Sequence, residues 1–470
     1  MGGGQSNNHG DRNAPVKVGM ISLGCAKNLV DGEIMLGRLQ RSGVELTADA
    51  TSADVVIVNT CGFITDAKKE SIDSILEVVH AKENGQVQRL VVAGCMAQAY
   101  ADDLLREIPE IDAFVGLDEL ESITAAVRGE IEAHIPDQRG ALKVYDHHNP
   151  RVLSTSGYAY LKVAEGCDNP CSFCHIPAMR GSFRSRSIDD LVTEAQALEV
   201  SGVQEIVLIA QDTTRYGEDI GLRRGLRSLI EALLVRTSIP WIRFLYAYPS
   251  TLDEGLFELM ATEDRFLSYL DIPLQHASRP VLKAMKRGGD AQSYRALIRR
   301  ARATVEDLAV RTTFIVGFPG EGEQEFEELL DFVRALRFDH LGVFTYSWQE
   351  ENPGSDLGDP VPDEVKMARR DAILEVQQEI SMENNRRFVG RISPALVTGR
   401  LEEMELLLDA RLARQAPEID GRLLINDGFA PAGSLVDVEV TEAHPYDLVG
   451  KIVSVIRPGP EHRSRLPVVG

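Results

Sequence analysis

The stretch EGCDNPCSFCHIP, residues 165–177, places three cysteines at the spacing C-x-x-x-C-x-x-C. Cys167, Cys171 and Cys174 lie within eight residues, so together they can wrap one face of an iron–sulfur cluster. A four-iron cluster needs four cysteines to ligate all of its irons. Three thiolates therefore leave one iron open to a small molecule, and the motif predicts an iron–sulfur site that takes part in chemistry.

A zinc site and a ferredoxin-type loop are the two alternatives to this interpretation. Structural zinc sites need four protein ligands and usually take them from C-x-x-C pairs. No fourth cysteine lies near the motif, and His175 directly follows Cys174, a position from which its ring reaches the same metal poorly. The spacing favours the open four-iron cluster.

The other three cysteines are far apart in sequence but share one local context. Each directly follows a short apolar run: GMISLGC for Cys25, DVVIVNTC for Cys61 and RLVVAGC for Cys95. Such runs alternate with helical patterns over residues 16–128, which predicts a doubly wound parallel sheet. Loops beyond the C-terminal strand ends of such a sheet converge on one crevice. One cysteine alone would more often be a buried apolar residue, but three at equivalent loop positions predict a second open cluster.

The rest of the chain divides into two further patterns. Six strand–helix units between residues 158 and 346 predict a partial (β/α)6 barrel with its active site at the C-terminal strand ends, followed by a long charged helix at 363–387. Short runs separated by Gly, Pro and Asp after residue 390 predict a small antiparallel β-barrel. We therefore expect an α/β chain with the following parts: a tail at 1–15, the N-terminal cysteine domain at 16–128, a linker at 129–156, the barrel core at 157–390, the small β-barrel at 391–460 and a tail at 461–470.

Polar or glycine-rich stretches follow several predicted barrel strands, where ligand contacts are expected. A structural role in the loop is an equal alternative for each of them. Nearby, RGSFRSR carries three arginines, and either a bound carboxylate or cofactor, or ion pairing within the loop, would account for these charges. The residues concerned are Gln211 and Asp212, Gln275 and His276, Ile315 and Gly317, and Arg180, Arg184 and Arg186.

The chain is acidic, with 50 Lys and Arg against 72 Asp and Glu and a formal net charge of -22. Nucleic-acid binders usually carry a basic stripe, whereas an acidic chain matches a basic protein partner. Acidity for solubility alone is the simpler alternative. No apolar run approaches the roughly 20 residues that span a bilayer, and residues 1–15 do not read as a secretory signal. A cytosolic enzyme with reduced thiols is expected.

The cysteine motif with an aromatic residue, Phe173, before its last cysteine resembles the radical S-adenosylmethionine superfamily. That resemblance implies that the methionine amine and carboxylate of S-adenosylmethionine chelate the open iron. One-electron reduction then cleaves the sulfonium to give a 5′-deoxyadenosyl radical. The resemblance also implies a cofactor pocket, and we expect these residues to contribute to it: Phe173, Gln211, Gln275, Ile315 and Gly317.

Within that superfamily, YLKVAEGCDNPCSFCHIPAMRG is similar to the methylthiotransferases. Their three-part layout, with an N-terminal cysteine domain, a radical barrel and a C-terminal TRAM barrel, covers residues 16–458 of this chain. The resemblance implies two [4Fe-4S] clusters, of which the barrel cluster makes the radical. The cluster of Cys25, Cys61 and Cys95 holds the incoming sulfur, which a second S-adenosylmethionine methylates. No catalytic residue beyond the cluster ligands is assigned.

Two substrate classes occur among methylthiotransferases, an adenosine in transfer RNA and an aspartate in a ribosomal protein. LGCAKNLVDGEIM resembles the ribosomal-protein members, whereas the RNA-modifying members tend to read Gly-Cys-Gln-Met-Asn at that place. GFITDAKKESI, LDIPLQHAS, RTTFIVGFPGE and APEIDG also match the former class. Gly32 stands where the family usually has Ser and Gly322 where it usually has Thr, and neither replaces a ligand.

The charge of the C-terminal region bears on the same choice. Residues 393–470 hold eight Lys and Arg against twelve Asp and Glu, whereas a barrel that grips RNA is expected to be basic. LEEMELLLD at 401–409 is either an acidic docking edge or a solvated strand. We expect methylthiolation of the β-carbon of an aspartate in protein S-twelve, a basic protein of the small ribosomal subunit. An electron donor and a sulfur donor are further partners, with no membrane and no nucleic acid as primary substrate. Transfer RNA methylthiolation and a non-catalytic iron–sulfur carrier are the alternatives.

Overall fold

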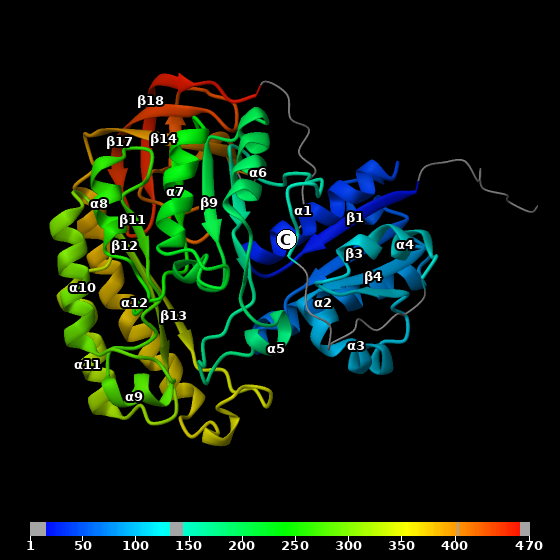
Figure 1. The fold of residues 1–470 in the computed structure, drawn as a ribbon, viewed down its shortest axis with the longest axis horizontal. Coiled ribbons are helices and arrows are strands. Elements are labelled where there is room, and N and C mark those ends of the chain that lie inside the picture. Colours follow the sequence, from blue (N-terminus) through cyan, green and yellow to red (C-terminus); the bar gives the residue numbers. More distant parts are fainter. Residues whose placement is uncertain (1–15, 132–143, 402–403, 461–470) are drawn as a thin grey trace, which may run out of the picture.

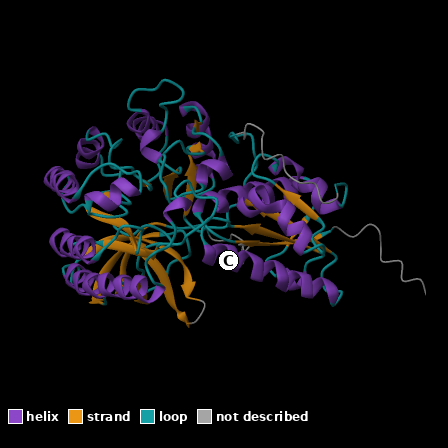
Figure 2. Cartoon of the chain, turned by 90° about the horizontal axis from the view of Figure 1, so that it is seen from below, coloured by secondary structure: helices purple, strands orange, loops and turns teal. Residues whose placement is uncertain are grey.

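The computed structural model describes residues 16–131, 144–401 and 404–460, so the predicted tails at 1–15 and 461–470 lie outside the described residues. In Figure 1 the N-terminal domain, blue to cyan, lies beside the central barrel, green to yellow. The C-terminal strands, orange to red, cover one end of that barrel. Figure 2 shows the N-terminal strands on one side of the molecule, apart from the remaining strands. Within the described residues, no helix combines the length and apolarity required to cross a membrane.

The N-terminal domain is a parallel sheet of five strands in the order β2-β1-β3-β4-β5. Its central strand reads VVIVNT and is buried throughout, as expected of a strand with helices on both faces. This confirms the doubly wound sheet, although the two-residue strand β2 was not predicted. The strands are β1 (Lys17–Ser22), β2 (Glu45–Leu46), β3 (Val55–Thr60), β4 (Arg89–Gly94) and β5 (Ala113–Val115), and the helices are α1 (Ala26–Arg41), α2 (Thr65–Glu83), α3 (Cys95–Glu107) and α4 (Ile123–Arg128).

The prediction that all three N-terminal cysteines lie in loops is wrong for Cys95. Helix α3 begins at Cys95, and its backbone departs from helical geometry only at Tyr100, with φ -132°. Gly94 has a φ of 89°, a left-handed conformation that glycine adopts without strain. The chain therefore turns from strand β4 directly into a helix, and Cys25 likewise sits at the N-cap of α1.

The central domain is the predicted partial barrel of six parallel strands. They form two three-stranded sheets, β10-β9-β6 and β11-β12-β13, joined by a single bridge between Ile242 and Phe266. Among the described residues no pairing joins β6 to β13, so the barrel is open on that side. The strands are β6 (Tyr158–Lys162), β9 (Glu205–Ile209), β10 (Trp241–Phe244), β11 (Tyr269–Asp271), β12 (Ala309–Val316) and β13 (His340–Thr345).

Helices cover the outside of this barrel (Figure 1). The long charged helix also forms as predicted and packs against β13 and its neighbouring helix α11. The main helices are α6 (Ile188–Val200), α7 (Gly225–Arg236), α8 (Gly255–Thr262), α9 (Arg279–Ala284), α10 (Ala291–Thr304), α11 (Glu323–Leu336) and α12 (Asp363–Arg386).

The two faces of the barrel strands belong to different cores. Outward-facing residues such as Leu161 and Leu208 pack with the surrounding helices. Inward-facing residues such as Tyr160 and Ile209 instead share a core with Val30 of α1, because successive residues of a strand point to opposite faces. Burial of this inner face thus holds the N-terminal domain against the open barrel.

The C-terminal domain is a closed barrel of five strands in the order β14-β15-β16-β18-β17. Its neighbours pair antiparallel except β16 and β18, which run parallel. A closed ring with an odd number of strands cannot alternate direction throughout, so the predicted antiparallel barrel needs one such pair. The strands are β14 (Ile392–Leu401), β15 (Met404–Leu412), β16 (Leu423–Asp427), β17 (Leu435–Ala443) and β18 (Leu448–Arg457).

Candidate functional site

The cysteine motif of the barrel forms the loop of a small hairpin. Strands β7 (Ala164–Glu165) and β8 (Arg184–Ser185) pair antiparallel at its base, and α5 (Ile176–Arg180) lies within it. The backbone N–H of Cys167 donates to the Gly181 carbonyl at 3.1 Å. Gly166 has a φ of 76°, and a Cβ there would lie 2.1 Å from the Ser182 carbonyl oxygen. Glycine is therefore required where the two strands close the loop.

The three thiols of this loop lie close enough to affect one another. Cys167 and Cys171 are buried and Cys174 is partly buried. Burial, together with the neighbouring Cys171 and Cys167, raises the pKa of Cys174 to about 12. A guanidinium nitrogen of Arg287 lies 3.9 Å from the Cys171 sulfur. The loop thus gathers three thiols with one cation beside them, which is the donor set predicted for the first cluster.

The sheet topology brings the other three cysteines together as predicted. Cys25 and Cys95 begin helices and Cys61 follows β3 directly. A Cβ on Gly24, whose φ is 91°, would lie 2.7 Å from the Cys61 Cβ. Glycine is therefore needed where the segment preceding Cys25 meets Cys61.

The three N-terminal thiols differ in acidity. Burial raises the pKa of Cys61 to about 12, and Cys95 and Cys25 add to this shift. Burial also acts to raise the pKa of Cys25, but Lys27 and Arg180 outweigh it and the net shift is downward. Mutual effects of this kind require the three thiols to be close neighbours.

Among the described residues, no three His, Cys, Asp or Glu side chains are arranged to bind a single metal ion. A four-iron cluster has a different requirement, because each of its cysteines binds a different iron. Both trios supply the soft thiolate donors that iron–sulfur clusters take.

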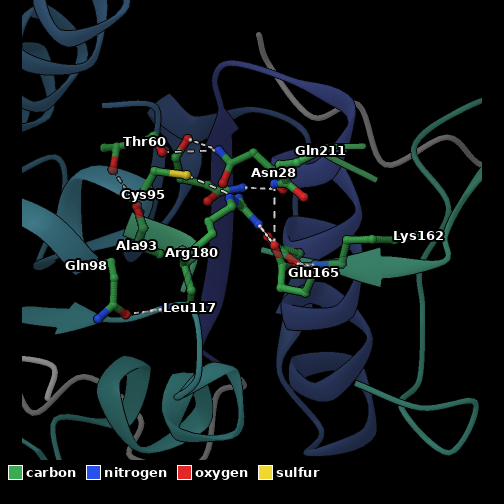
Figure 3. A network of polar contacts seen from close by, with 12 residues as sticks. Asn28, Thr60, Ala93, Cys95, Gln98, Leu117, Lys162, Glu165, Arg180 and Gln211 are labelled. Atoms are coloured by element: carbon green, nitrogen blue, oxygen red, sulfur yellow. Dashed lines mark hydrogen bonds and ion pairs between the residues drawn. The ribbon is translucent and has the colours of Figure 1, made fainter. Parts of the chain in front are cut away.

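A buried polar network runs from Cys95 through Arg180 to Glu165 and Lys162 (Figure 3). Arg180, which is 1% exposed, donates to the Cys95 sulfur at 3.1 Å and to Glu165 at 3.0 Å, and also pairs with Asp31 at 3.2 Å. Lys162 completes the network, bonded to both carboxylates. Although burial acts to raise the pKa of Glu165, Arg180 and Lys162 outweigh it and hold that pKa far below its usual range. Arg180 belongs to the barrel loop and Cys95 to the N-terminal domain, so this contact links the two sites.

The arginines of RGSFRSR are engaged within the protein. Arg180 is paired as described, and Arg186 pairs with Asp190 at 2.6 Å and Glu194 at 2.7 Å. Arg184 donates to the Arg180 carbonyl at 3.0 Å. Of the two alternatives, binding within the protein therefore accounts for this stretch.

Two of the five residues predicted to contact the cofactor lie together in space. Phe173 and Ile315 both pack against one apolar cluster, which contains Val281, Met285, Phe318 and Tyr346. Gln211 donates to Glu165 at 3.5 Å, while its buried Oε1 has no hydrogen-bond partner. Gln275 holds a left-handed φ of 71°, a strained conformation that concentrates at functional sites. An apolar wall and a free buried acceptor fit a ligand that carries both a ring and polar groups.

Other predicted residues have structural partners. A Cβ on Gly317 would lie 2.2 Å from Lys366 Cγ, so the side chain of Lys366 makes the close approach there. Asp212 accepts hydrogen bonds from Asn169 at 2.8 Å and Thr214 at 2.6 Å. His276 is fully buried, with its Nδ1 accepting from the Ser278 N–H at 2.9 Å.

Comparison with known families divides the chain in three. Residues 17–116 match Uncharacterized protein family UPF0004, residues 161–333 match the Radical SAM superfamily, and residues 389–453 match the TRAM domain. These three matches follow one another along most of the chain.

Relatives match over nearly the whole length. The ribosomal protein uS12 methylthiotransferase RimO of Syntrophotalea carbinolica is 46% identical over 93% of this chain and 97% of its own. The RimO of Solibacter usitatus is 47% identical over 95% and 96%, and that of Geobacter sulfurreducens 44% identical over 94% and 100%. The chain belongs to the RimO family of methylthiotransferases.

A RimO-family chain is a radical S-adenosylmethionine methylthiotransferase, with two [4Fe-4S] clusters and S-adenosylmethionine as cofactors. Among solved structures, the radical S-adenosylmethionine methyltransferase TsrM from Kitasatospora setae superposes with a TM-score of 0.53 over 73% of this chain and 77% of its own. At 16% identity that likeness concerns the fold alone.

Sequence reasoning missed two cation–aromatic pairs in this RimO-family site. The Lys27 ammonium lies 3.4 Å from the centre of the Tyr246 ring, and the Arg287 guanidinium 4.0 Å from that of Tyr248. Both tyrosines follow β10 in the stretch YAYPS. Two aromatic residues directly after a barrel strand are the signal that could have drawn attention to this loop.

Proposed function

We propose that this enzyme methylthiolates the β-carbon of an aspartate in ribosomal protein uS12. The observation that carries the proposal is the convergence of two cysteine trios on one interface, linked by Arg180. Relatives that are 46% and 47% identical are named ribosomal protein uS12 methylthiotransferases. The two sites supply separate functions, since a radical generator and a sulfur carrier need different open irons.

We assign one cluster to each trio. When bound, the clusters and S-adenosylmethionine supply the radical that removes a hydrogen and the methylthio group that replaces it. Phe173 and Ile315 would line the adenine side of the cofactor, and Gln211 offers a buried acceptor to its polar end. Gln275 and Gly317 stay predicted contacts. The ligand sets are Cys167, Cys171 and Cys174 for the barrel cluster, and Cys25, Cys61 and Cys95 for the N-terminal cluster.

The partners follow from charge and chemistry. A chain of net charge -22 attracts a basic ribosomal protein and repels nucleic acid. Reductive cleavage requires an electron donor, and the inserted sulfur requires a sulfur donor. We place the reaction in the cytoplasm, where thiols stay reduced, with no part for a membrane. The docking role of LEEMELLLD stays a prediction, and its Glu402 and Glu403 lie outside the described residues.

The test presents recombinant uS12 and transfer RNA side by side to the reconstituted enzyme. Mass spectrometry should show one hydrogen of an aspartate in uS12 replaced by a methylthio group, with transfer RNA unchanged. Capture of uS12 should weaken as salt rises, because screening shortens the attraction to about 8 Å near physiological ionic strength. Methylthioadenosine in the transfer RNA, with unmodified uS12, would instead establish the RNA-modifying alternative. Clusters that never cleave S-adenosylmethionine under reduction would point to a carrier.

A further inference from the structure

Lys27 is a buried cation at the boundary between the N-terminal site and the barrel. It is the second residue of α1, two positions after Cys25, and its side chain is 6% exposed. Its ammonium lies 3.4 Å from the centre of the Tyr246 ring, which belongs to the loop after barrel strand β10. The charge of Lys27 therefore lies both beside Cys25 and at the mouth of the barrel.

The partners of Lys27 differ from those of the other cations nearby. Arg180 and Lys162 both pair with Asp31 and Glu165. Within the part of the chain that the structure describes, no carboxylate lies within ion-pair distance of Lys27. A buried ammonium without a carboxylate partner is unfavourable, and an aromatic face offsets only part of that cost. The fold thus leaves the Lys27 ammonium without a carboxylate partner while it pairs Arg180 and Lys162, and it places Lys27 beside Cys25, whose pKa it helps to lower.

The backbone of Tyr246, the aromatic partner of Lys27, is fixed by two hydrogen bonds. The Tyr246 N–H donates to Asp271 at 2.8 Å, and its carbonyl accepts from the Thr213 N–H at 3.1 Å. Tyr246 also has a left-handed φ of 64°, a strained conformation for a bulky residue. These backbone contacts help to position the ring that lies beside the Lys27 ammonium, and such preorganisation favours selective binding.

The reaction determines which anion this charge fits. The β-carbon of an aspartate is bonded directly to its carboxylate, so a carbon presented between the two trios brings a carboxylate with it.

We propose that Lys27 binds the side-chain carboxylate of the target aspartate and thereby selects an acidic protein side chain. This inference rests on the proposed function and names the residue that recognises the substrate at that site. Lys27 is a specificity residue in this role, because it holds the group next to the reacting carbon.

A double-mutant cycle tests this contact, using reconstituted enzyme and the target aspartate identified by mass spectrometry. Wild-type enzyme should bind uS12 about 30-fold less tightly when that aspartate is changed to asparagine, the loss expected for one hydrogen bond between charged groups. Lys27→Met should lose a similar factor with native uS12 and almost nothing more with the asparagine form. Lys27→Arg should keep part of the discrimination, because it keeps the charge. Iron content is measured for each variant, so that binding is compared only between enzymes that carry the same amount of iron.

Lys68→Met is the matched control. Lys68 also lies over a tyrosine ring, 4.5 Å from the centre of Tyr100, but it donates to Gln349 at 2.6 Å. The Lys68→Met enzyme should still bind the asparagine form of uS12 about 30-fold less tightly than native uS12. The comparison separates a particular lysine from a general loss of positive charge.

Independent losses of affinity would overturn the inference. If the fold loss in uS12 binding for the double substitution equals the product of the losses for Lys27→Met and for aspartate to asparagine, Lys27 and the aspartate do not contact each other. The inference also fails if wild-type enzyme binds and modifies both forms of uS12 equally, a result that needs no variant and holds even if Lys27→Met does not load iron. Wild-type enzyme that modifies no aspartate in uS12 would instead remove the proposed function, and this inference with it.

Discussion

The two cysteine trios reach similar ligand sets by different routes. Cys167, Cys171 and Cys174 belong to one hairpin loop, so a few local contacts place them. Cys25, Cys61 and Cys95 come from three strand–helix junctions and meet only when the parallel sheet has formed. The first site is a local property of the chain, and the second is a property of the fold.

The surroundings of the two trios also differ. Arg287 lies 3.9 Å from the Cys171 sulfur and is partly exposed. Arg180 lies 3.1 Å from the Cys95 sulfur and is enclosed by buried carboxylates. The N-terminal site is thus embedded in the interdomain ion network, and its integrity depends on the barrel as well as on its own domain.

Replacing the barrel trio should have the largest effect. We expect the Cys167→Ala, Cys171→Ala, Cys174→Ala variant to bind about four irons instead of about eight per chain, since each complete cluster holds four. Reductive cleavage of S-adenosylmethionine and methylthio transfer should both be lost. Iron analysis and quantification of 5′-deoxyadenosine measure these losses. Cleavage that survived would show that another site makes the radical.

Replacing the N-terminal trio should remove only one of the two activities. The Cys25→Ala, Cys61→Ala, Cys95→Ala variant should also bind about four irons and should still cleave S-adenosylmethionine. It should transfer no sulfur to uS12, because the remaining site lacks a sulfur carrier. Undiminished iron in this variant would mean that the three cysteines do not form a cluster site.

The same contrast explains what could be predicted from the sequence. The barrel motif can be recognised because its three ligands lie within eight residues of one another. The N-terminal convergence can be recognised because each cysteine follows a strand pattern. The start of α3 at Cys95 was missed because it depends on the left-handed turn at Gly94. The lack of a carboxylate partner for Lys27 could not be predicted, because it depends on which carboxylates pair with Arg180 in the folded protein.

Replacing the arginine beside each trio should lower the free energy of unfolding by different amounts at the two sites. Arg180→Met leaves Asp31 and Glu165 buried with only Lys162 between them, and breaking a buried ion network of this kind costs about 3–5 kcal/mol of unfolding free energy. Arg287→Met loses a hydrogen bond to the Pro273 carbonyl and should cost about 1 kcal/mol.

Denaturant unfolding of the metal-free proteins, monitored in the N-terminal domain and the barrel, measures both costs. The Arg180 loss should appear in both domains because its partners come from both. Equal costs for the two variants would contradict the difference drawn between the sites.

The smallest expected effect is a difference in acidity within the N-terminal trio. Lys27 and Arg180 lower the pKa of Cys25, whereas burial raises that of Cys61 to about 12. Because the thiolate is the nucleophile, alkylation of Cys25 in the metal-free protein should level off near or below the ordinary thiol pKa of about 8.5. Alkylation of Cys61 should still rise well above it.

Peptide mass spectrometry of iodoacetamide-treated protein across a pH series measures how alkylation of Cys25 and of Cys61 depends on pH. Comparing the shapes of the two curves, and not their heights, removes the effect of the different solvent exposure of the two thiols. Lys27→Met should move the Cys25 profile to higher pH while leaving that of Cys61 nearly unchanged, since Lys27 is the leading cause that lowers the Cys25 pKa. Parallel profiles for Cys25 and Cys61 in the wild-type protein would show that the cations beside Cys25 do not distinguish it from its neighbours.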